Sequence, residues 1–262
     1  SVTGVQTCAL PISLDQIEKE VIDVMDLTTE FLNKFGFSDY EIFVSTKPKK
    51  YVGTDDEWES ATNSLKKSLD NKSLKYSIDD GGGAFYGPKI DLKIKDVLGR
   101  SWQCSTVQVD FNLPRRFDLE YISSNNERLQ PVMIHRAIFG SFERFFGILI
   151  EHYGGAFPTW LAPHQLKLLS VSDEQVEYVN DIADNLRSAG LRVEVDIRNE
   201  KLGLKIREGE ISKVPFIGIV GKNELENKTI SLRKYGGKQI GEIKLDQLLG
   251  LIKNELSGRV DT

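Results

Sequence analysis

Polar side chains interrupt an otherwise apolar stretch at residues 131–147, which predicts a strand running into a helix. His135 lies on the predicted strand, and Gly140, Ser141 and Arg144 lie where the helix begins. Phenylalanine and aliphatic residues cover nearly every face of that helix, and a helix that is apolar all round is normally buried. A buried guanidinium is costly unless it is paired or binds a ligand, so Arg144 should meet a carboxylate, a phosphate or an aromatic ring. From spacing alone, an internal ion pair of Arg144 and a contact of Arg144 with a ligand are equally compatible with the sequence.

The wording of this segment, MIHRAIFGSFERFFGILIEHYGG, resembles motif 3 of the class II aminoacyl-tRNA synthetases, in particular their threonine-specific branch. The resemblance implies that Arg144 packs on the adenine of ATP and reaches its triphosphate. It implies that Gly140 lets the nucleotide approach the backbone, with Ser141 in the same ATP-binding group. It also makes His135 a ligand of a catalytic zinc ion. Without the resemblance, a lone histidine on an apolar strand would be interpreted as a core residue.

A glycine-rich segment that ends in GAFYGPK leads into the next predicted strand. By itself, a glycine run before a strand predicts only a flexible turn. The segment resembles one found in the same family, which implies that Tyr86 lies against the bound amino acid. The resemblance further implies that Lys89 stabilises negative charge on the carboxylate or the α-phosphate during adenylation.

The strand predicted at residues 101–111 carries two glutamines, Gln103 and Gln108, and the resemblance implies that both contact adenylate or threonine. Odd and even positions point to opposite faces of a regular strand. Only one glutamine can therefore face the site unless a β-bulge intervenes. We favour the face of Gln108, which simple alternation groups with Trp102. Cys104 is expected to be a small buried residue or part of a pocket wall.

Periodicity divides the chain into regions of different class. Residues 1–13 lack the features of a signal peptide and look like translated adapter or vector sequence, with a genuine N-terminal arm as the alternative. Residues 14–155 predict helices and an antiparallel sheet, the C-terminal part of a class II catalytic domain. A proline-containing linker follows at residues 156–163, and alternating strands and helices at residues 164–262 predict an α/β domain with a mostly parallel sheet. The fold class is thus α+β followed by α/β. Five polar residues of the first domain are expected to converge on one cleft: Tyr86, Lys89, Gln108, His135 and Arg144.

The second domain resembles the anticodon-binding domain that several class II synthetases share, above all in the segment RNEKLGLKIRE. Residues 163–262 contain 16 Lys and Arg against 16 Asp and Glu, so an RNA-binding face must come from local patterning;. The resemblance implies five contacts to anticodon base edges or phosphates: Asn199, Arg207, Lys213, Glu224 and Arg233. From the residues alone, two structural interpretations are as open as the RNA contacts: Asn199 as the cap of a helix, and Glu224 as a solvated surface residue.

Composition narrows the class of protein further. The 262 residues are 40% hydrophobic and 28% charged, which is ordinary for a globular protein;. Two cysteines, Cys8 and Cys104, cannot build a disulfide framework, and no apolar run reaches membrane-spanning length;. A cytoplasmic location and no membrane partner are therefore expected.

Together the resemblances imply a ligase that activates threonine with ATP and magnesium and transfers it to tRNA-Thr, as a homodimer in the complete enzyme. Motif 1, motif 2 and the other two zinc ligands of the family are not recognisable here. This chain alone is therefore expected to hold an incomplete zinc site and not to activate threonine. Two alternatives remain open: another synthetase of the subclass, such as the prolyl enzyme, and a non-catalytic tRNA-binding module. His135 and the GAFYGPK segment disfavour the prolyl enzyme.

Overall fold

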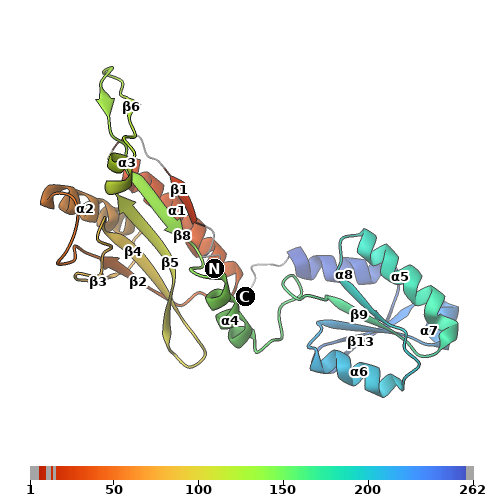
Figure 1. Cartoon of the computed structure of the whole chain (residues 1–262). Helices are drawn as coiled ribbons and strands as arrows, with labels where there is room; N and C mark the ends of the chain where they lie inside the picture. The colour runs from red at the N-terminus through yellow and green to blue at the C-terminus, as the bar shows by residue number, and fades with distance from the viewer. Residues whose placement is uncertain (1–5, 10–12, 14–15, 258–262) are drawn as a thin grey trace. The chain divides into compact units, whose positions relative to one another are not determined.

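The computed structural model describes residues 6–9, 13 and 16–257, which form two compact units (Figure 1). The first unit comprises Ser1–His152 and the second Tyr153–Thr262. Within this described part, no helix is long and apolar enough to cross a membrane.

A six-stranded sheet forms the first unit, in the order β1-β8-β5-β4-β2-β3. All neighbours pair antiparallel except β2 and β3, which pair parallel. The antiparallel sheet expected from the sequence is therefore confirmed. In sheet order the strands are β1 (Gln6–Ala9), β8 (Met133–Ala137), β5 (Ser101–Asp110), β4 (Lys89–Lys95), β2 (Tyr40–Ser45) and β3 (Ser77–Asp79).

Two long helices, α1 (Gln16–Lys34) and α2 (Asp55–Asn71), pack on each other and on one face of this sheet (Figure 1). Even-numbered residues of β4, among them Leu92, are fully buried beneath them. Thr54 begins α2 with a capping box, which satisfies backbone N–H groups of the first turn;. The remaining elements are α3 (Asn112–Arg116), the hairpin β6 (Tyr121–Ile122) and β7 (Arg128–Leu129), and α4 (Phe142–Tyr153).

A β-bulge interrupts the pairing of β4 with β5. Leu92 pairs with Ser105, but the next residue of β4, Lys93, pairs with Gln103, so Cys104 is an extra residue in β5. An extra residue reverses the alternation of side chains on one side of the bulge. Cys104 itself is buried, as expected, and burial raises the pKa of its thiol to about 11.

The bulge decides which face each glutamine of β5 occupies. Gln108 pairs with Lys89 and Gln103 pairs with Lys93, and these lysines lie on one face of β4;. Both glutamines therefore face away from α1 and α2. The grouping of Gln108 with Trp102 by simple alternation is wrong, because the tryptophan precedes the bulge and pairs with a buried residue on the helix-covered face.

Asp96 holds the turn between β4 and β5. Its carboxylate accepts hydrogen bonds from the backbone N–H groups of Leu98 and Arg100, both at 2.9 Å, and from the Trp102 indole at 2.8 Å. Desolvation acts to raise the pKa of this carboxyl group. The hydrogen bonds from Trp102 and from both groups of Arg100 outweigh it and lower the pKa from 3.8 to about 2.

A carboxyl group with a lowered pKa stabilises the fold above its unfolded pKa, and this contribution is lost as the pH falls through the folded value. The unfolding free energy of the wild type should therefore exceed that of Asp96→Asn by a constant margin above about pH 4. Between about pH 4 and pH 2 the margin should shrink. Urea titrations of both proteins across this range measure it. A margin that does not change with pH would contradict this role of Asp96.

The second unit contains a five-stranded sheet in the order β10-β9-β11-β12-β13. The three strands β10, β9 and β11 are parallel, but β12 and β13 join antiparallel, so the expected mostly parallel sheet is parallel in only half of its pairings. The short turn between β12 and β13 requires these two strands to be antiparallel, because parallel neighbours need a long crossover;. The strands are β9 (Leu166–Ser170), β10 (Val193–Asp196), β11 (Phe216–Val220), β12 (Ile230–Lys234) and β13 (Lys238–Ile243).

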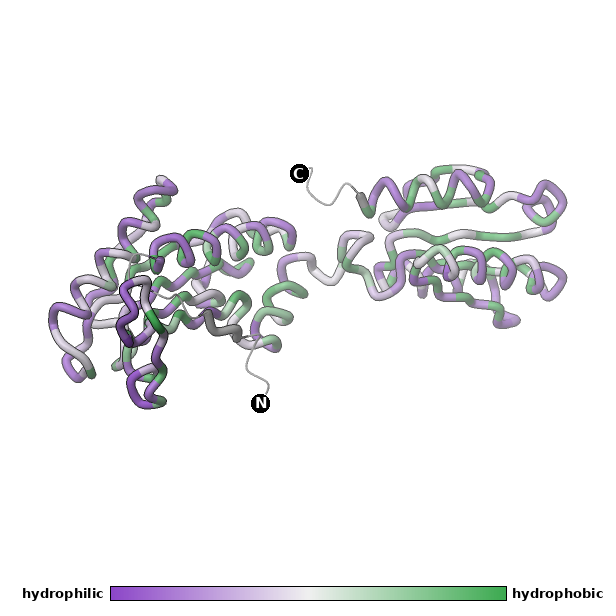
Figure 2. The backbone as a smooth tube through the Cα atoms, turned by 90° about the horizontal axis from the view of Figure 1, so that it is seen from above, coloured by the Kyte–Doolittle hydropathy of each residue, from purple (hydrophilic) through white to green (hydrophobic). Residues whose placement is uncertain are grey.

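Helices cover both faces of this sheet, which makes three layers (Figure 1). Helices α5 and α8 pack on one face of the sheet and enclose the main apolar core of this unit, and α6 lies on the opposite face of the sheet. Hydrophobic and hydrophilic residues alternate along these helices in Figure 2, as in amphipathic helices that pack on a sheet;. The helices are η1 (Asp173–Gln175), α5 (Val176–Ser188), α6 (Leu202–Ile211), α7 (Lys222–Asn227) and α8 (Leu245–Ser257).

Candidate active site and RNA-binding residues

Three of the site residues expected from the sequence form one row across neighbouring strands. Lys89 of β4 pairs with Gln108 of β5, and Gln108 pairs with His135 of β8. Residues that are directly opposed in an antiparallel pair place their side chains on the same face. The face that α1 and α2 leave uncovered therefore carries an amine, an amide and an imidazole side by side.

Tyr86 joins this row from the loop before β4. Its hydroxyl donates a hydrogen bond of 2.7 Å to Oε1 of Gln108, and its ring centroid lies 6.1 Å from that of His135. Burial, together with the charge of Asp110, raises the pKa of the Tyr86 phenol. Gly87 lets the loop approach β5, because a Cβ at this position would lie 1.6 Å from the carbonyl oxygen of Val109.

Lys89 and Gln103 converge on one carboxylate. Nζ of Lys89 lies 2.7 Å from Oδ2 of Asp91, and Nε2 of Gln103 donates to Oδ1 of the same residue at 2.6 Å. Sequence reasoning missed Asp91, although one signal was present. In the sequence, Asp91 lies between the apolar residues Ile90 and Leu92 of a predicted strand, and a carboxylate within a sheet requires hydrogen-bonding partners;.

His135 is hydrogen-bonded to a second buried carboxylate. Its Nε2 lies 2.9 Å from Oδ2 of Asp110, and Oδ1 of Asp110 accepts the backbone N–H groups of Asn112 and Leu113. Zinc sites of catalytic type need three protein ligands. Among the residues that the structure describes, no group of three His, Cys, Asp or Glu side chains could hold a metal ion. The described residues thus do not fit the three-ligand zinc site of the family. The backbone of Cys8 lies opposite His135 in β1, but its side chain is outside the described part.

Arg144 is exposed, so the expectation that α4 buries it is wrong. The helix packs through residues such as Phe145 and leaves Phe142, 66% exposed, and Phe146, 47% exposed, on its outer side. The Arg144 guanidinium donates a hydrogen bond of 2.8 Å to the backbone oxygen of Gln103 and lies over an aromatic ring of β5. It therefore reaches the sheet at the bulge while remaining accessible to solvent.

Gly140 and Ser141 shape the junction between β8 and α4. Gly140 has a φ of +67°, and a Cβ there would lie 3.0 Å from the carbonyl oxygen of Cys104. Glycine is therefore required by the fold itself. Oγ of Ser141 accepts the backbone N–H of Arg144 at 3.2 Å, as an N-terminal cap does;. The expected nucleotide contacts of both residues stay predictions.

A cavity of about 380 Å³ lies elsewhere in this unit, between the start of α2 and the base of the β6–β7 hairpin. Its lining includes Glu57, Arg115, Tyr121 and Val132 and none of the five residues expected to share a cleft. The row of Lys89, Gln108 and His135 therefore lies outside this cavity. Convergence of the five residues on one cleft stays a prediction.

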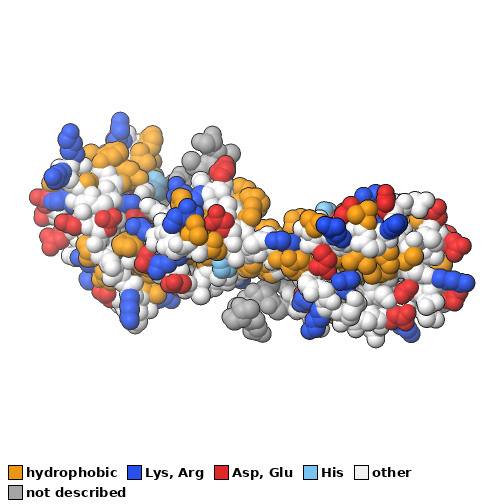
Figure 3. Space-filling model, turned by 90° about the horizontal axis from the view of Figure 1, so that it is seen from below, with side chains coloured by type: hydrophobic (Ala, Val, Ile, Leu, Met, Phe, Trp, Pro, Cys, Tyr) orange, Lys and Arg blue, Asp and Glu red, His pale blue; other side chains and the backbone are white. Residues whose placement is uncertain are grey.

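The five expected anticodon residues differ in exposure. Asn199, in the loop between β10 and α6, and Arg207, on α6, are exposed. The N-cap of α6 is Lys201, so Asn199 does not cap that helix. On the face seen in Figure 3, basic and acidic side chains are interspersed over the second unit. An RNA contact there would depend on individual side chains.

The other three residues form contacts within the unit. Glu224 accepts a hydrogen bond of 2.8 Å from the backbone N–H of Gly221 and one of 2.7 Å from Ser231. Desolvation opposes these bonds, but they lower the pKa of Glu224. It is thus not simply a solvated surface residue.

The two remaining basic residues also have internal partners. Lys213 donates to the backbone oxygen of Gly154, and Arg233 lies 3.4 Å from Glu210 in an ion pair. Sequence reasoning could not foresee these contacts, because each joins separate elements.

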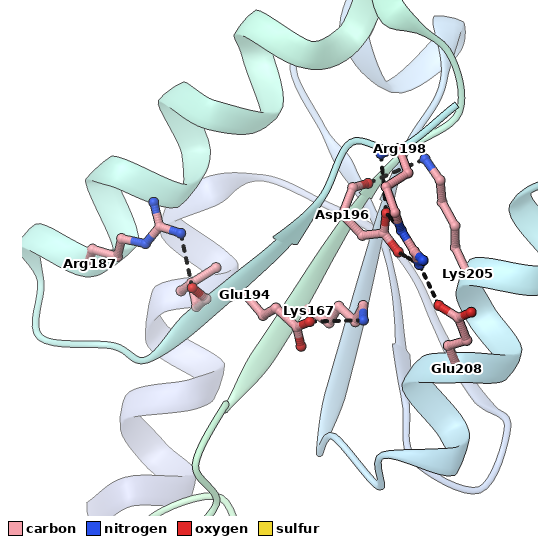
Figure 4. Close-up of polar contacts among 8 residues, drawn as sticks. Lys167, Arg187, Glu194, Asp196, Arg198, Lys205 and Glu208 are labelled. Carbon is pink, nitrogen blue, oxygen red and sulfur yellow. Dashed lines mark hydrogen bonds and ion pairs between the residues drawn. The ribbon is translucent and has the colours of Figure 1, made fainter. Parts of the chain in front are cut away.

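A charged network anchors the loop that carries Asn199 (Figure 4). Arg198 donates to Asp196 through Nε at 2.9 Å and through Nη2 at 2.6 Å, and it also pairs with Glu208 of α6. Lys205, only 1% exposed, donates to the backbone oxygens of Ser170 and Asp196. The ends of β9 and β10 are thereby tied to α6.

Comparison with known families agrees with this architecture. The model described as tRNA synthetase class II core domain (G, H, P, S and T) matches residues 4–153, and the model of the anticodon binding domain matches residues 165–255. The chain belongs to the class II aminoacyl-tRNA synthetases. The first match begins inside the segment expected to be foreign, and the origin of that segment stays a prediction.

Within the class, the chain is similar to threonine-tRNA ligases. It is 49% identical over 245 residues to that of Sulfurihydrogenibium sp. (strain YO3AOP1), and 51% identical over 238 residues to the chloroplastic/mitochondrial 2 enzyme of Arabidopsis thaliana. These alignments cover 94% and 91% of this chain but only 38% and 36% of the relatives. The chain therefore spans less than two fifths of the length of these relatives.

Among solved structures, too, the chain is more similar to a threonyl-tRNA synthetase than to a prolyl-tRNA synthetase. The RNA binding domain of threonyl-tRNA synthetase from Cryptosporidium parvum Iowa II has a TM-score of 0.90 and 36% identity, covering 96% of this chain and 63% of that one. A prolyl-tRNA synthetase of Cryptosporidium parvum reaches a TM-score of 0.66 at 14% identity, covering 97% of this chain and 49% of that one. The similarity to the prolyl-tRNA synthetase concerns the fold alone. Similarity to threonine-tRNA ligases is therefore favoured over the prolyl alternative.

Proposed function

We propose that the complete protein containing this chain is a threonine-tRNA ligase, which activates threonine with ATP and magnesium and transfers it to tRNA-Thr. The observation that carries the proposal is the row of Lys89, Gln108 and His135 on one open face, joined by Tyr86. The similarity to threonine-tRNA ligases supports the choice of amino acid. The cytoplasmic location and the dimer expected from the sequence stay predictions.

In the proposed reaction, the threonine carboxylate attacks the α-phosphorus of ATP, the bond to the bridging oxygen breaks, and pyrophosphate leaves. The Lys89 ammonium stabilises negative charge on the attacking and transferring groups. The Tyr86 hydroxyl and the amides of Gln103 and Gln108 orient threonine and adenylate. The exposed Arg144 guanidinium offers adenine a planar cationic surface.

Zinc has a limited place in this proposal. His135 is the residue of this chain that would contribute an imidazole ligand, and a bound zinc ion would orient threonine through its amino and hydroxyl groups. Because the described residues do not supply three ligands, no step above depends on the metal. That the 262-residue chain alone does not activate threonine also stays a prediction.

The RNA-binding part of the proposal is tested with Asn199→Ala and Arg207→Ala in the complete protein. Each change should weaken aminoacylation of tRNA-Thr by about 1–3 kcal/mol in kcat/KM, because an exposed base or phosphate contact is lost. Threonine-dependent pyrophosphate exchange should remain nearly unchanged, since adenylation does not use the anticodon.

The matched control is Lys253→Ala, which removes an exposed cation from α8 on the other side of the second sheet. It should leave both assays unchanged. Equal losses in both assays for the two test variants would mean that Asn199 and Arg207 have a structural role only.

A further inference from the structure

A single carboxylate on the open face of the first sheet accepts hydrogen bonds from four side chains. Oδ1 of Asp91 accepts a hydrogen bond of 2.6 Å from Nε2 of Gln103 and one of 2.8 Å from Oγ1 of Thr106. Oδ2 lies 2.7 Å from Nζ of Lys89 and accepts a hydrogen bond of 3.0 Å from Oγ of Ser45. These donors come from β2, β4 and β5, so Asp91 joins three neighbouring strands at one point.

The burial of Asp91 defines what it can do. The residue is only 2% exposed, and a buried carboxylate is tolerated when its oxygens are hydrogen-bonded;. Each oxygen has two donors, which matches the acceptor capacity of an ionised carboxylate. A substrate would therefore meet the groups around Asp91 rather than its oxygens.

Two of these donors are residues already assigned to the site. The Lys89 side chain is 15% exposed and has three donor hydrogens, of which one is directed at Asp91;. The Gln103 amide reaches the same carboxylate only because the bulge at Cys104 turns it to this face. One buried anion thus sets the spacing between an ammonium group and an amide group.

We propose that Asp91 is a positioning residue for adenylation: it holds the Lys89 ammonium and the Gln103 amide in the arrangement that the reacting groups require. The inference rests on the proposed function. Without the carboxylate, the flexible lysine side chain would sample several rotamers, and the amide would lose its nearest acceptor. The loss would appear in the rate of the chemical step, because ATP is bound mainly through other groups.

The positioning itself is tested on the 262-residue chain, without reference to activity. Asp91→Asn keeps the shape but directs an amide N–H₂ group at donors such as Lys89, which should release that side chain. In brief acetylation followed by peptide mass spectrometry, Lys89 should react about ten-fold faster in the variant, the factor that corresponds to a lost charge-assisted hydrogen bond. Lys95, exposed on the same strand, is the internal reference and should not change.

The matched control is Asp96→Asn, which removes another buried carboxylate next to the same strand. It should leave the reactivity of Lys89 unchanged relative to Lys75, an exposed lysine outside β4. If Asp91→Asn does not fold, the wild type decides the question, because an anchored Lys89 must react at least about ten-fold more slowly than Lys95. Equal reactivity of these lysines in the wild type, or no change of Lys89 in a folded Asp91→Asn, would overturn the proposal.

The consequence for catalysis is tested in the complete protein. Asp91→Asn should lower kcat of threonine-dependent pyrophosphate exchange about ten-fold or more with little change in KM for ATP. In a Lys89→Met background the same change should have almost no further effect, because the two residues act as one unit. Additive losses would show that Asp91 acts on stability and not through Lys89. If the parent protein shows no threonine-dependent exchange, the proposed function fails, whereas the acetylation result still decides whether Asp91 anchors Lys89.

Discussion

Replacing Arg144 with alanine in the complete protein should slow threonine-dependent pyrophosphate exchange by about 10²–10³-fold, the loss typical of one charge-stabilising group. The guanidinium is exposed and its hydrogen bond goes to a backbone oxygen, that of Gln103. Its removal therefore leaves no buried carboxylate unpaired, and the melting temperature should change little. Exchange kinetics and thermal unfolding of the same samples measure both effects.

Arg100 offers a matched control, because two arginines lie over the ring of Trp102. The Arg100 guanidinium is 5.6 Å from the ring centroid and that of Arg144 is 5.9 Å. Arg100 also pairs with Asp96, so Arg100→Ala should reduce stability but leave the exchange rate of the folded enzyme within a few-fold. Similar losses of exchange in the two variants would contradict a nucleotide-binding role for Arg144.

Gly87→Ala should have the largest effect on the fold of the first unit. The added Cβ would lie 1.6 Å from the carbonyl oxygen of Val109, so the loop and β5 would have to separate. Overpacking of this kind costs about 3 kcal/mol when backbone must move. Tyr86, the preceding residue, would then lose its hydrogen bond to Gln108.

Hydrogen exchange of peptides from β4 and β5 measures this effect, with β9 and β11 of the second unit as an internal reference. Gly147→Ala is the control, because a Cβ on this residue of α4 meets no atom within 4 Å. Helix propensity predicts that this change stabilises the chain by about 0.5–1 kcal/mol. Unchanged protection of β4 and β5 in Gly87→Ala would show that the close approach is absent in solution.

Local patterns were sufficient for most of the elements. The apolar stretch at residues 131–147 predicted β8 and α4, and the segment ending in GAFYGPK predicted β4, in which apolar and polar residues alternate. Patterns of this kind depend only on neighbours along the chain. They could not show that β12 joins β11 antiparallel, because the direction of that pairing depends on which strands meet in the folded sheet.

The site shows where sequence patterns are insufficient. Gln103 faces the site because of a bulge at Cys104, and a bulge exists only in the register of two paired strands. Arg144 is exposed because α4 packs through one stripe and leaves Phe142 and Phe146 outside, although apolar residues cover nearly every face of the helix. Asp91 was missed because its four donors come from three strands and meet only in the folded sheet.

Amino-acid-dependent pyrophosphate exchange by the complete protein tests the central claim most directly. Threonine, proline, serine and valine are supplied in separate reactions with ATP and magnesium, and incorporation of labelled pyrophosphate into ATP is followed. The account predicts exchange with threonine well above that with proline or valine, and its loss in Arg144→Ala and Lys89→Met. Exchange that depends on proline, or tRNA binding without exchange on any of the four amino acids, would contradict it.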